Sequence, residues 1–256
     1  YFPHPDGKTG TQIATTEFFW TKATPPPTQL EAALQLELAG SGYILNTTNG
    51  RLPWSPPHPV WNTALDLEPG AYTLRVAAAD ATGKISAATN TSFTVEPADG
   101  NDVQISSLVL GKSCVFAPQS PSVAGQTTID YLRAGNCDLQ PDASHYYSPQ
   151  DIVWTLVRMT PVGKLANRPS KDWKGSFILI DANGSRLAEE PVHWLPAEGG
   201  SLVATTAFPL DNPKLKLTNG DYAVVFRLKG PGIESGYGED ASFSVYGEVQ
   251  PASSTR

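Results

Sequence analysis

Apolar and polar residues alternate along most of the chain, and clusters of Gly, Pro, Asn and Asp interrupt the alternation every few positions. Alternation is typical of β-strands, because successive side chains point to opposite faces of a sheet. In the first half the expected strands are 11–23, 30–38, one that ends at Leu67 after a Pro- and Trp-rich loop at 51–61, 71–79 and 85–96. In the second half they are 103–110, 112–117, 127–135, 151–160, 176–181, 201–208, 215–217, 222–228 and 241–246. No long amphipathic helix interrupts this series, so the pattern predicts an all-β protein.

A turn-rich stretch near the middle of the sequence indicates a domain boundary. Residues 97–102 read Pro-Ala-Asp-Gly-Asn-Asp, a composition typical of a linker. A chain of 256 residues is also long enough for two domains. We therefore expect a tail and possible donor strand at 1–24, a first domain at 25–97, a linker at 98–102, a second domain at 103–248 and a flexible tail at 249–256.

The same apolar pattern occurs in both halves, 150 positions apart. In each copy a Leu-x-Leu pair precedes a turn, the next strand begins Gly-x-Tyr, and a last strand carries Ser-Phe-x-Val. The first copy contains Leu65, Leu67, Gly70, Tyr72 and Phe93, and the second contains Leu215, Leu217, Gly220, Tyr222 and Phe243. The two copies align without a gap, which indicates two related β-modules.

This pattern resembles the last three strands of immunoglobulin-like and fibronectin type III-like domains. In those families a tyrosine near the start of the penultimate strand bonds back to the preceding turn, forming a tyrosine corner. Tyr72 and Tyr222 match that tyrosine, and Trp154 matches the core tryptophan of such a sandwich. The resemblance implies two tandem immunoglobulin-like antiparallel β-sandwiches, the second enlarged by insertions near 140–150 and 186–200. Neither half has the cysteine pair that joins the two sheets of antibody domains.

The segment 11–23 has two possible positions. Without it, the first domain has no more than five expected strands, whereas a complete sandwich of this class has about seven. The segment can fold back as the first strand of its own domain. Alternatively, Pro25–Pro27 hold it away and it adds to a neighbouring copy by β-augmentation. The residues that would then contact the neighbour are Ile13, Phe18, Phe19 and Trp20.

Charge and cysteine content narrow the possible partners and the compartment. The net charge is −7 and the isoelectric point is about 5.1, which argues against a nucleic-acid partner. No apolar run reaches the length of a membrane helix, so no membrane insertion is expected. Cys114 and Cys137 are the only cysteines, and they are expected to form a disulfide in an oxidising compartment. Two buried free thiols are the alternative.

Catalytic and metal-binding motifs are missing from the sequence. His4, His58, His145 and His193 lie in loops without partners at metal-ligand spacing. Residues 181–185, Asp-Ala-Asn-Gly-Ser, begin like a calcium loop but lack the glutamate that would complete it, and a hairpin turn explains the same residues. We therefore expect no catalytic residue, no cofactor and no metal.

Two kinds of residue suggest contact with sugars. Asn46, Asn90 and Asn183 lie in glycosylation sequons within expected turns or strand edges. Aromatic side chains in or near loops could stack on sugar rings, or could instead close the ends of the sandwiches. These aromatic residues are Trp54, Trp61, Trp173, Trp194, Tyr146, Tyr147 and Tyr237.

Together these observations favour a non-enzymatic extracellular structural protein. In this hypothesis the chain is a self-assembling filament or surface-appendage subunit, joined head to tail to copies of itself through the N-terminal strand, with glycans as a second kind of partner. The alternative is a carbohydrate-binding or adhesion module of a larger secreted protein. A hydrolase would need a carboxylate pair or metal site that the linear sequence conceals.

Overall fold

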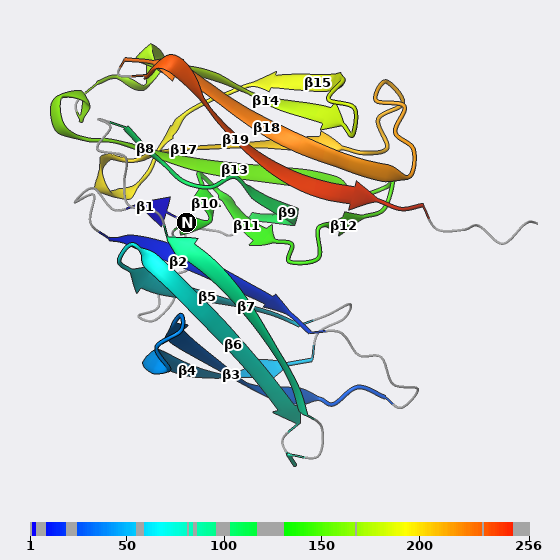
Figure 1. Cartoon of the computed structure of the whole chain (residues 1–256). Coiled ribbons are helices and arrows are strands. Elements are labelled where there is room, and N and C mark those ends of the chain that lie inside the picture. The colour runs from blue at the N-terminus through cyan, green and yellow to red at the C-terminus, as the bar shows by residue number, and fades with distance from the viewer. Residues whose placement is uncertain are drawn as a thin grey trace, which may run out of the picture. The chain divides into compact units, whose positions relative to one another are not determined.

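The computed structural model describes residues 2–3, 9–18, 25–54, 59–80, 82–83, 86–95, 103–116, 131–166, 168–231 and 233–247. Strands dominate these residues, and the described 3-10 helices are single turns at Gly163–Leu165, Ser170–Asp172 and Glu198–Gly200. The expected all-β fold is confirmed. The chain divides into two compact units, Pro3–Gly100 and Asn101–Arg256, and Phe2 groups with the second unit. Figure 1 colours the first unit from blue to cyan-green and the second from green to red.

The first unit contains two sheets. The three-stranded sheet has the order β1-β2-β5, and the four-stranded sheet has the order β4-β3-β6-β7 (Figure 1). Their strands are β1 (Phe2–Pro3), β2 (Gly10–Glu17), β3 (Gln29–Leu38), β4 (Tyr43–Pro53), β5 (Val60–Leu67), β6 (Gly70–Asp80) and β7 (Ser86–Val95). The sequence pattern does not predict β4, because much of the segment consists of turn-forming residues.

Alternating side chains determine which face of each central strand is buried. In β3, Leu34 and Leu36 are 1% exposed, whereas Glu31 between buried neighbours is exposed. The core that the two sheets share consists of Ala14, Leu34, Leu36, Leu65, Leu67, Tyr72, Leu74, Val76 and Val95. Burying each leucine side chain contributes about 1.5–3 kcal/mol, so this two-sheet contact stabilises the unit.

The second unit is a larger pair of sheets. One sheet has the order β10-β11-β9-β13-β17-β16, with β8 also paired to β13, and the other has the order β12-β19-β18-β14-β15. Their strands are β8 (Val103–Ile105), β9 (Val109–Phe116), β10 (Arg133–Ala134), β11 (Cys137–Pro141), β12 (Tyr146–Tyr147), β13 (Ile152–Pro161), β14 (Lys174–Asp181), β15 (Arg186–Pro191), β16 (Leu195–Pro196), β17 (Leu202–Pro209), β18 (Gly220–Gly230) and β19 (Ile233–Val245). Of the strand expected at 127–135, residues 133–134 are a strand, and residues 127–130 lie outside the described residues.

The pairing in this unit departs from the expectation in one respect. The two residues of β12 run parallel to β19, with Tyr146 opposite Ser244 and Tyr147 opposite Val245. The sandwich is therefore not purely antiparallel, because this short strand at the edge of the five-stranded sheet runs parallel to its neighbour.

The tryptophan in the second core is Trp173, not Trp154. Trp173 is 3% exposed and packs within the core cluster. Along β13, Val153, Val157 and Met159 face that core, so alternation places Trp154 on the opposite side of the sheet, where it is half-buried. The expectation that Trp154 is the core tryptophan is wrong.

Both units contain the same hydrogen-bonded tyrosine at the start of a strand. The Tyr72 hydroxyl donates to the Glu68 carbonyl at 2.6 Å, and the Tyr222 hydroxyl donates to the Thr218 carbonyl at 2.7 Å. Each tyrosine ring also stacks on the phenylalanine of the next strand, with centroid distances of 5.6 Å to Phe93 and 5.8 Å to Phe243. This is the geometry of a tyrosine corner. Burial raises the pKa of Tyr72, and the nearby Glu68 carboxylate adds to the effect.

The two repeats differ just before this corner. Leu65 and Leu67 end strand β5, but residues 215–217 are not a strand. Lys216 has a φ of 51°, in the left-handed region that extended chains do not use. Leu215 is nevertheless 7% exposed, so its burial does not require a strand. The prediction of a strand at 215–217 is wrong.

Replacing each corner tyrosine tests what the shared hydrogen bond contributes. Tyr72→Phe removes one hydrogen bond and should lower the free energy of unfolding by about 1 kcal/mol. Tyr222→Phe should cost more, because the Tyr222 hydroxyl also accepts a hydrogen bond from the Thr218 N–H at 3.0 Å. Urea denaturation followed by tryptophan fluorescence measures both losses. Tyr43→Phe, at a ring that is 66% exposed, is the control and should change nothing; equal losses in all three variants would contradict the assignment.

The disulfide between Cys114 and Cys137 gives a second stability test. It joins β9 to β11, and the two Cα atoms are 5.3 Å apart. Replacing both cysteines by serine should lower the free energy of unfolding by roughly 3 kcal/mol, because the unfolded chain regains a loop of that size. Chemical denaturation measures the loss. Dithiothreitol should destabilise the natural chain and leave the double variant unaffected, and an unchanged midpoint for the reduced natural chain would contradict the prediction.

Candidate interaction surface

The outer face of the four-stranded sheet carries side chains in rows that cross the strands. One row is Arg51, Glu31 and Ala79; the next is Asn49, Ala33, Ala77 and Ala88; and the third is Thr47, Gln35, Arg75 and Asn90. Three of the four members of the middle row are alanines, whereas the rows on either side carry long polar side chains. A trough therefore crosses the strands along the middle row.

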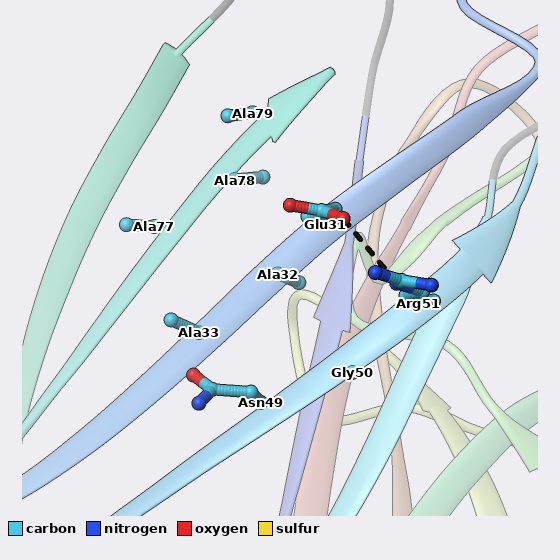
Figure 2. Close-up of a pocket in the computed structure, with 9 residues that line it drawn as sticks. All are labelled: Glu31, Ala32, Ala33, Asn49, Gly50, Arg51, Ala77, Ala78 and Ala79. Atoms are coloured by element: carbon cyan, nitrogen blue, oxygen red, sulfur yellow. Dashed lines mark ion pairs between the residues drawn. The ribbon is translucent and has the colours of Figure 1, made fainter. Parts of the chain in front are cut away.

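This trough forms a hollow at one end of the sheet. It has a volume of about 610 Å³, and its lining comprises Glu31, Ala32, Ala33, Asn49, Gly50, Arg51, Ala77, Ala78 and Ala79. Figure 2 shows the alanines of β3 and β6 beside the Glu31–Arg51 ion pair. A neighbouring hollow of about 480 Å³ shares Ala33 and Ala77 and extends to Arg75 and Asn90.

Two ion pairs flank the trough. The Glu31 carboxylate lies 3.3 Å from the Arg51 guanidinium, and both side chains are more than half exposed. The Glu37 carboxylate lies 2.8 Å from the Arg75 guanidinium. The exposed Glu31–Arg51 pair contributes little to stability, and the two pairs together place both signs of charge at the rim. An open methyl floor with a mixed-charge rim suits binding of a polypeptide surface, whereas catalysis benefits from a site that excludes water.

Strand β4 forms one edge of this sheet and ends in an apolar patch. Tyr43, Ile44 and Leu45 are 66%, 52% and 44% exposed, and Leu38 opposite them on β3 is 38% exposed. Arg51 is the only charged residue in the eleven residues of β4. Natural edge strands usually carry charges, because an unpaired edge attracts other strands. The edge β4 is thus unusually open to pairing.

The three sequons lie on two edge strands and in a turn. Asn46 is exposed on β4, Asn90 is exposed on β7, and these strands form the two edges of the four-stranded sheet. Asn183 is exposed in the turn between β14 and β15. All three side chains are accessible, but whether they carry glycans stays a prediction.

The N-terminal strand pairs within its own chain. β2 is antiparallel to β5 along its full length, from Gly10 opposite Leu67 to Glu17 opposite Val60. Ala14 is 8% exposed in the shared core, Phe18 packs against that core, and Ile13 is half-buried. Phe19 and Trp20 lie outside the described residues. The single chain thus shows the first of the two alternatives, in which this strand belongs to its own domain.

Most of the aromatic residues considered for sugar binding are buried or packed against other residues. Trp173 and Tyr147 are buried. The Trp61 indole lies close to Gly50, where an added Cβ would be 3.2 Å from the ring. The ring centroids of Trp194 and Phe226 are 6.2 Å apart. Trp54 and Tyr237 are half-buried, which leaves Tyr146, at 59% exposed, as the accessible member of the set.

Residues 181–185 form a turn. The Asp181 carboxylate accepts hydrogen bonds from the Asn183 and Ser185 N–H groups at 2.9 and 2.8 Å, so it is used within the turn. Across the described residues, no group of three or more His, Cys, Asp or Glu side chains is placed to hold a metal ion. His4 and His58 lie outside those residues.

One polar cluster in the second unit was not predicted. The Asp142 carboxylate accepts hydrogen bonds from the Ser144 N–H and hydroxyl at 3.1 and 2.7 Å, and lies 3.6 Å from the Lys112 ammonium. Burial raises the pKa of Tyr147, and the charge of Asp142 adds to the effect. The cluster lies beside two exposed tyrosines, Tyr146 and Tyr246. Sequence reasoning missed Tyr246, because only the pairing of β12 with β19 brings it next to Tyr146.

Comparisons with known proteins do not place the chain in a family. No protein-family model matches it, and no curated protein matches it. A solved structure described as a biofilm associated protein, BSP domain, is 12% identical over 93% of this chain and 49% of its own length, with a TM-score of 0.24. A leucine-rich repeat protein from Bacteroides thetaiotaomicron is 11% identical over 92% of this chain and 26% of its own length, with a TM-score of 0.21. The chain spans about half the length of the first structure and about a quarter of the second. At such TM-scores neither likeness carries weight. No helix in the described part of the chain is long and apolar enough to cross a membrane.

Proposed function

We propose that the chain is a non-enzymatic, extracellular structural or adhesive protein of immunoglobulin-like sandwiches, and that its copies join through their strands. The disulfide supports an oxidising compartment. The open, mixed-charge face of the four-stranded sheet supports binding rather than catalysis. The tyrosine corners in both units support the immunoglobulin-like assignment.

The observation that carries this proposal is the edge strand β4. It is eleven residues long, and its apolar end exposes Tyr43, Ile44 and Leu45. Exposed apolar clusters rimmed by polar residues mark interaction sites, and an unpaired strand edge adds backbone hydrogen bonds to that attraction. We take a second copy of the chain as the partner.

Self-pairing of β4 is chemically permitted. In an antiparallel pair centred on Thr48, Ile44 of one copy lies opposite Leu52 of the other, and Leu45 lies opposite Arg51. No two like charges then face each other, because Arg51 is the only charge in the strand. The two four-stranded sheets would become one continuous sheet.

Adding charge to the β4 edge tests this association. The double variant Ile44→Lys/Leu45→Lys should be monomeric, because two lysines per copy repel at the edge, and its melting temperature should be unchanged, because both positions are about half exposed. Sedimentation velocity over a range of concentrations measures the oligomeric state.

Val115→Lys is the matched control. Val115 is 49% exposed on β9 in the second unit, so a lysine there adds a charge of the same sign without changing the β4 edge. Natural protein that remains monomeric at every concentration, or a β4 variant that still associates, would overturn strand pairing at β4.

The finer form of the proposal is a filament joined through the N-terminal strand. β2 supplies the middle strand of the sheet β1-β2-β5, and Pro25–Pro27 precede the next strand, β3. Exchange of β2 with a neighbour would recreate the contacts that it makes within one chain, and such head-to-tail contacts propagate unless they close into a ring. Pairing at β4 alone would stop at a dimer, so exchange of β2 is the step that extends a filament.

Cysteine cross-linking separates exchange from pairing within one chain. Thr15 and Asn62 lie opposite each other, with their side-chain oxygens 2.9 Å apart. A Thr15→Cys chain mixed with an Asn62→Cys chain should form a covalent heterodimer only if β2 exchanges, as judged by non-reducing electrophoresis. The double variant in one chain is the control and should close internally when β2 stays with its own domain. Monomers alone in the mixture, with closure in the double variant, would exclude the filament.

A further inference from the structure

Two exposed tyrosines lie side by side at the end of the second unit. Tyr146 and Tyr246 are 59% and 54% exposed, and their ring centroids are 5.8 Å apart with the planes inclined at 45°. Large aromatic side chains are usually at least partly covered. Two adjacent rings that both face solvent are therefore a candidate binding surface.

The backbone holds the two rings in place. The Tyr246 N–H donates to the Tyr147 carbonyl at 3.0 Å, and the Ser244 N–H donates to the His145 carbonyl at 2.9 Å. The neighbours of the exposed rings, Tyr147 and Val245, are buried at 2% and 0% exposed. Each exposed tyrosine is thus adjacent in sequence to a residue anchored in the core, so little conformational freedom remains to be lost on binding.

Polar groups surround the aromatic pair. His145 Nδ1 lies 3.0 Å from the Ser242 carbonyl. Because a carbonyl only accepts hydrogen bonds, Nδ1 is the donor in this contact. The Ser144 hydroxyl donates to Asp142 at 2.7 Å and accepts hydrogen bonds from the Lys112 ammonium at 3.3 Å and the Tyr146 N–H at 3.2 Å, so it is fully used within the protein. The rim thus combines the His145 ring and the Lys112 cation.

His145 has an uncommon backbone conformation at this site. Its φ is 54°, in the left-handed region, which costs free energy for a residue with a side chain. Such conformations persist where the surrounding structure fixes them, and they occur often at functional sites. Here the conformation immediately precedes β12, the strand that carries Tyr146.

We propose that Tyr146 and Tyr246 form a carbohydrate-binding platform. Sugar rings have an apolar C–H face that packs on an aromatic ring, and hydroxyls at their edges that need donors and acceptors. The tyrosine pair provides the faces, and His145 and Lys112 provide polar groups nearby. The ligand is a neutral polysaccharide whose pyranose units have such a face.

A protein partner fits this surface less well. A stable protein interface buries about 800 Å² on each partner, and its centre is usually apolar. Among the described residues, the other exposed large apolar side chains lie on β3, β4, β5, β9 and β16, and none lies on β12 or β19. Two isolated rings in polar surroundings match a small ligand face.

Affinity electrophoresis of the full chain tests the proposal. Native gels containing soluble barley β-glucan, xylan, galactomannan or starch should retard the natural protein in at least one case. Tyr146→Ala and Tyr246→Ala should each weaken the apparent affinity at least about tenfold. Tyr146→Phe should retain binding, because the ring face remains. Val115→Ala, which removes an exposed apolar side chain from the same unit but outside both the tyrosine pair and the β4 edge, is the control and should bind normally.

The outcomes are distinguishable from those of strand assembly. Melting temperatures should be the same in all variants, because every substituted side chain is about half exposed or more. Failure of all four polysaccharides to retard the natural protein, or equal loss in Val115→Ala and Tyr146→Ala, would overturn the platform. Retention in both alanine variants would do the same. The Ile44→Lys/Leu45→Lys variant should bind sugar normally, so a monomeric chain that still binds sugar overturns only the assembly.

Discussion

The core of the first unit forms between a sheet of three strands and a sheet of four, and this mismatch determines which surfaces remain free. The narrower sheet covers the central strands β3 and β6, whose alternate leucines and valines are almost fully buried. It covers the flanking strands less well. Thr89 and Thr91 lie opposite the buried Val76 and Leu74, on the same face of the sheet, and both are exposed. Threonine tolerates this position because it has strand propensity and a hydroxyl that water can solvate. The open edges β4 and β7 therefore follow from how many strands each sheet contains.

The alternation of apolar and polar residues predicts the strands that lie in the middle of sheets. Burial of at least one face of such a strand requires an apolar residue at every second position. β3, β6, β13 and β18 are of this kind. β4 was missed because Asn46, Asn49 and Gly50 favour turns, and only pairing with β3 holds them extended. Trp154 was assigned to the core from a motif, but the phase of alternation along β13 decides its direction, and that phase follows from Val153 and Val157. The pairing of β12 with β19 joins residues about a hundred positions apart, and no local pattern indicates it.

The two units share a tyrosine corner and use their free surfaces differently. The first exposes aliphatic residues along a strand edge, a surface suited to backbone pairing. The second exposes two aromatic rings fixed at a short parallel bridge, a surface suited to a small ligand. Sequence repeats therefore identified what the units have in common, whereas the candidate sites lie in the parts that are not repeated. Tyr146 lies in the region 140–150, which the sequence marks as an insertion into the second sandwich.

The disulfide between β9 and β11 has a consequence for a protein under mechanical load. Tension applied along an unfolding chain lengthens it by the residues that are released, and the 23-residue separation between Cys114 and Cys137 would otherwise add roughly 75 Å of extended chain. The covalent bond removes that length from any extension in an oxidising environment. The same bond keeps the two parts of the chain attached if a protease cuts between the cysteines. A surface protein pulled by flow or by a neighbour would thus lengthen less under tension. It would also remain in one piece after a single cut between the two cysteines.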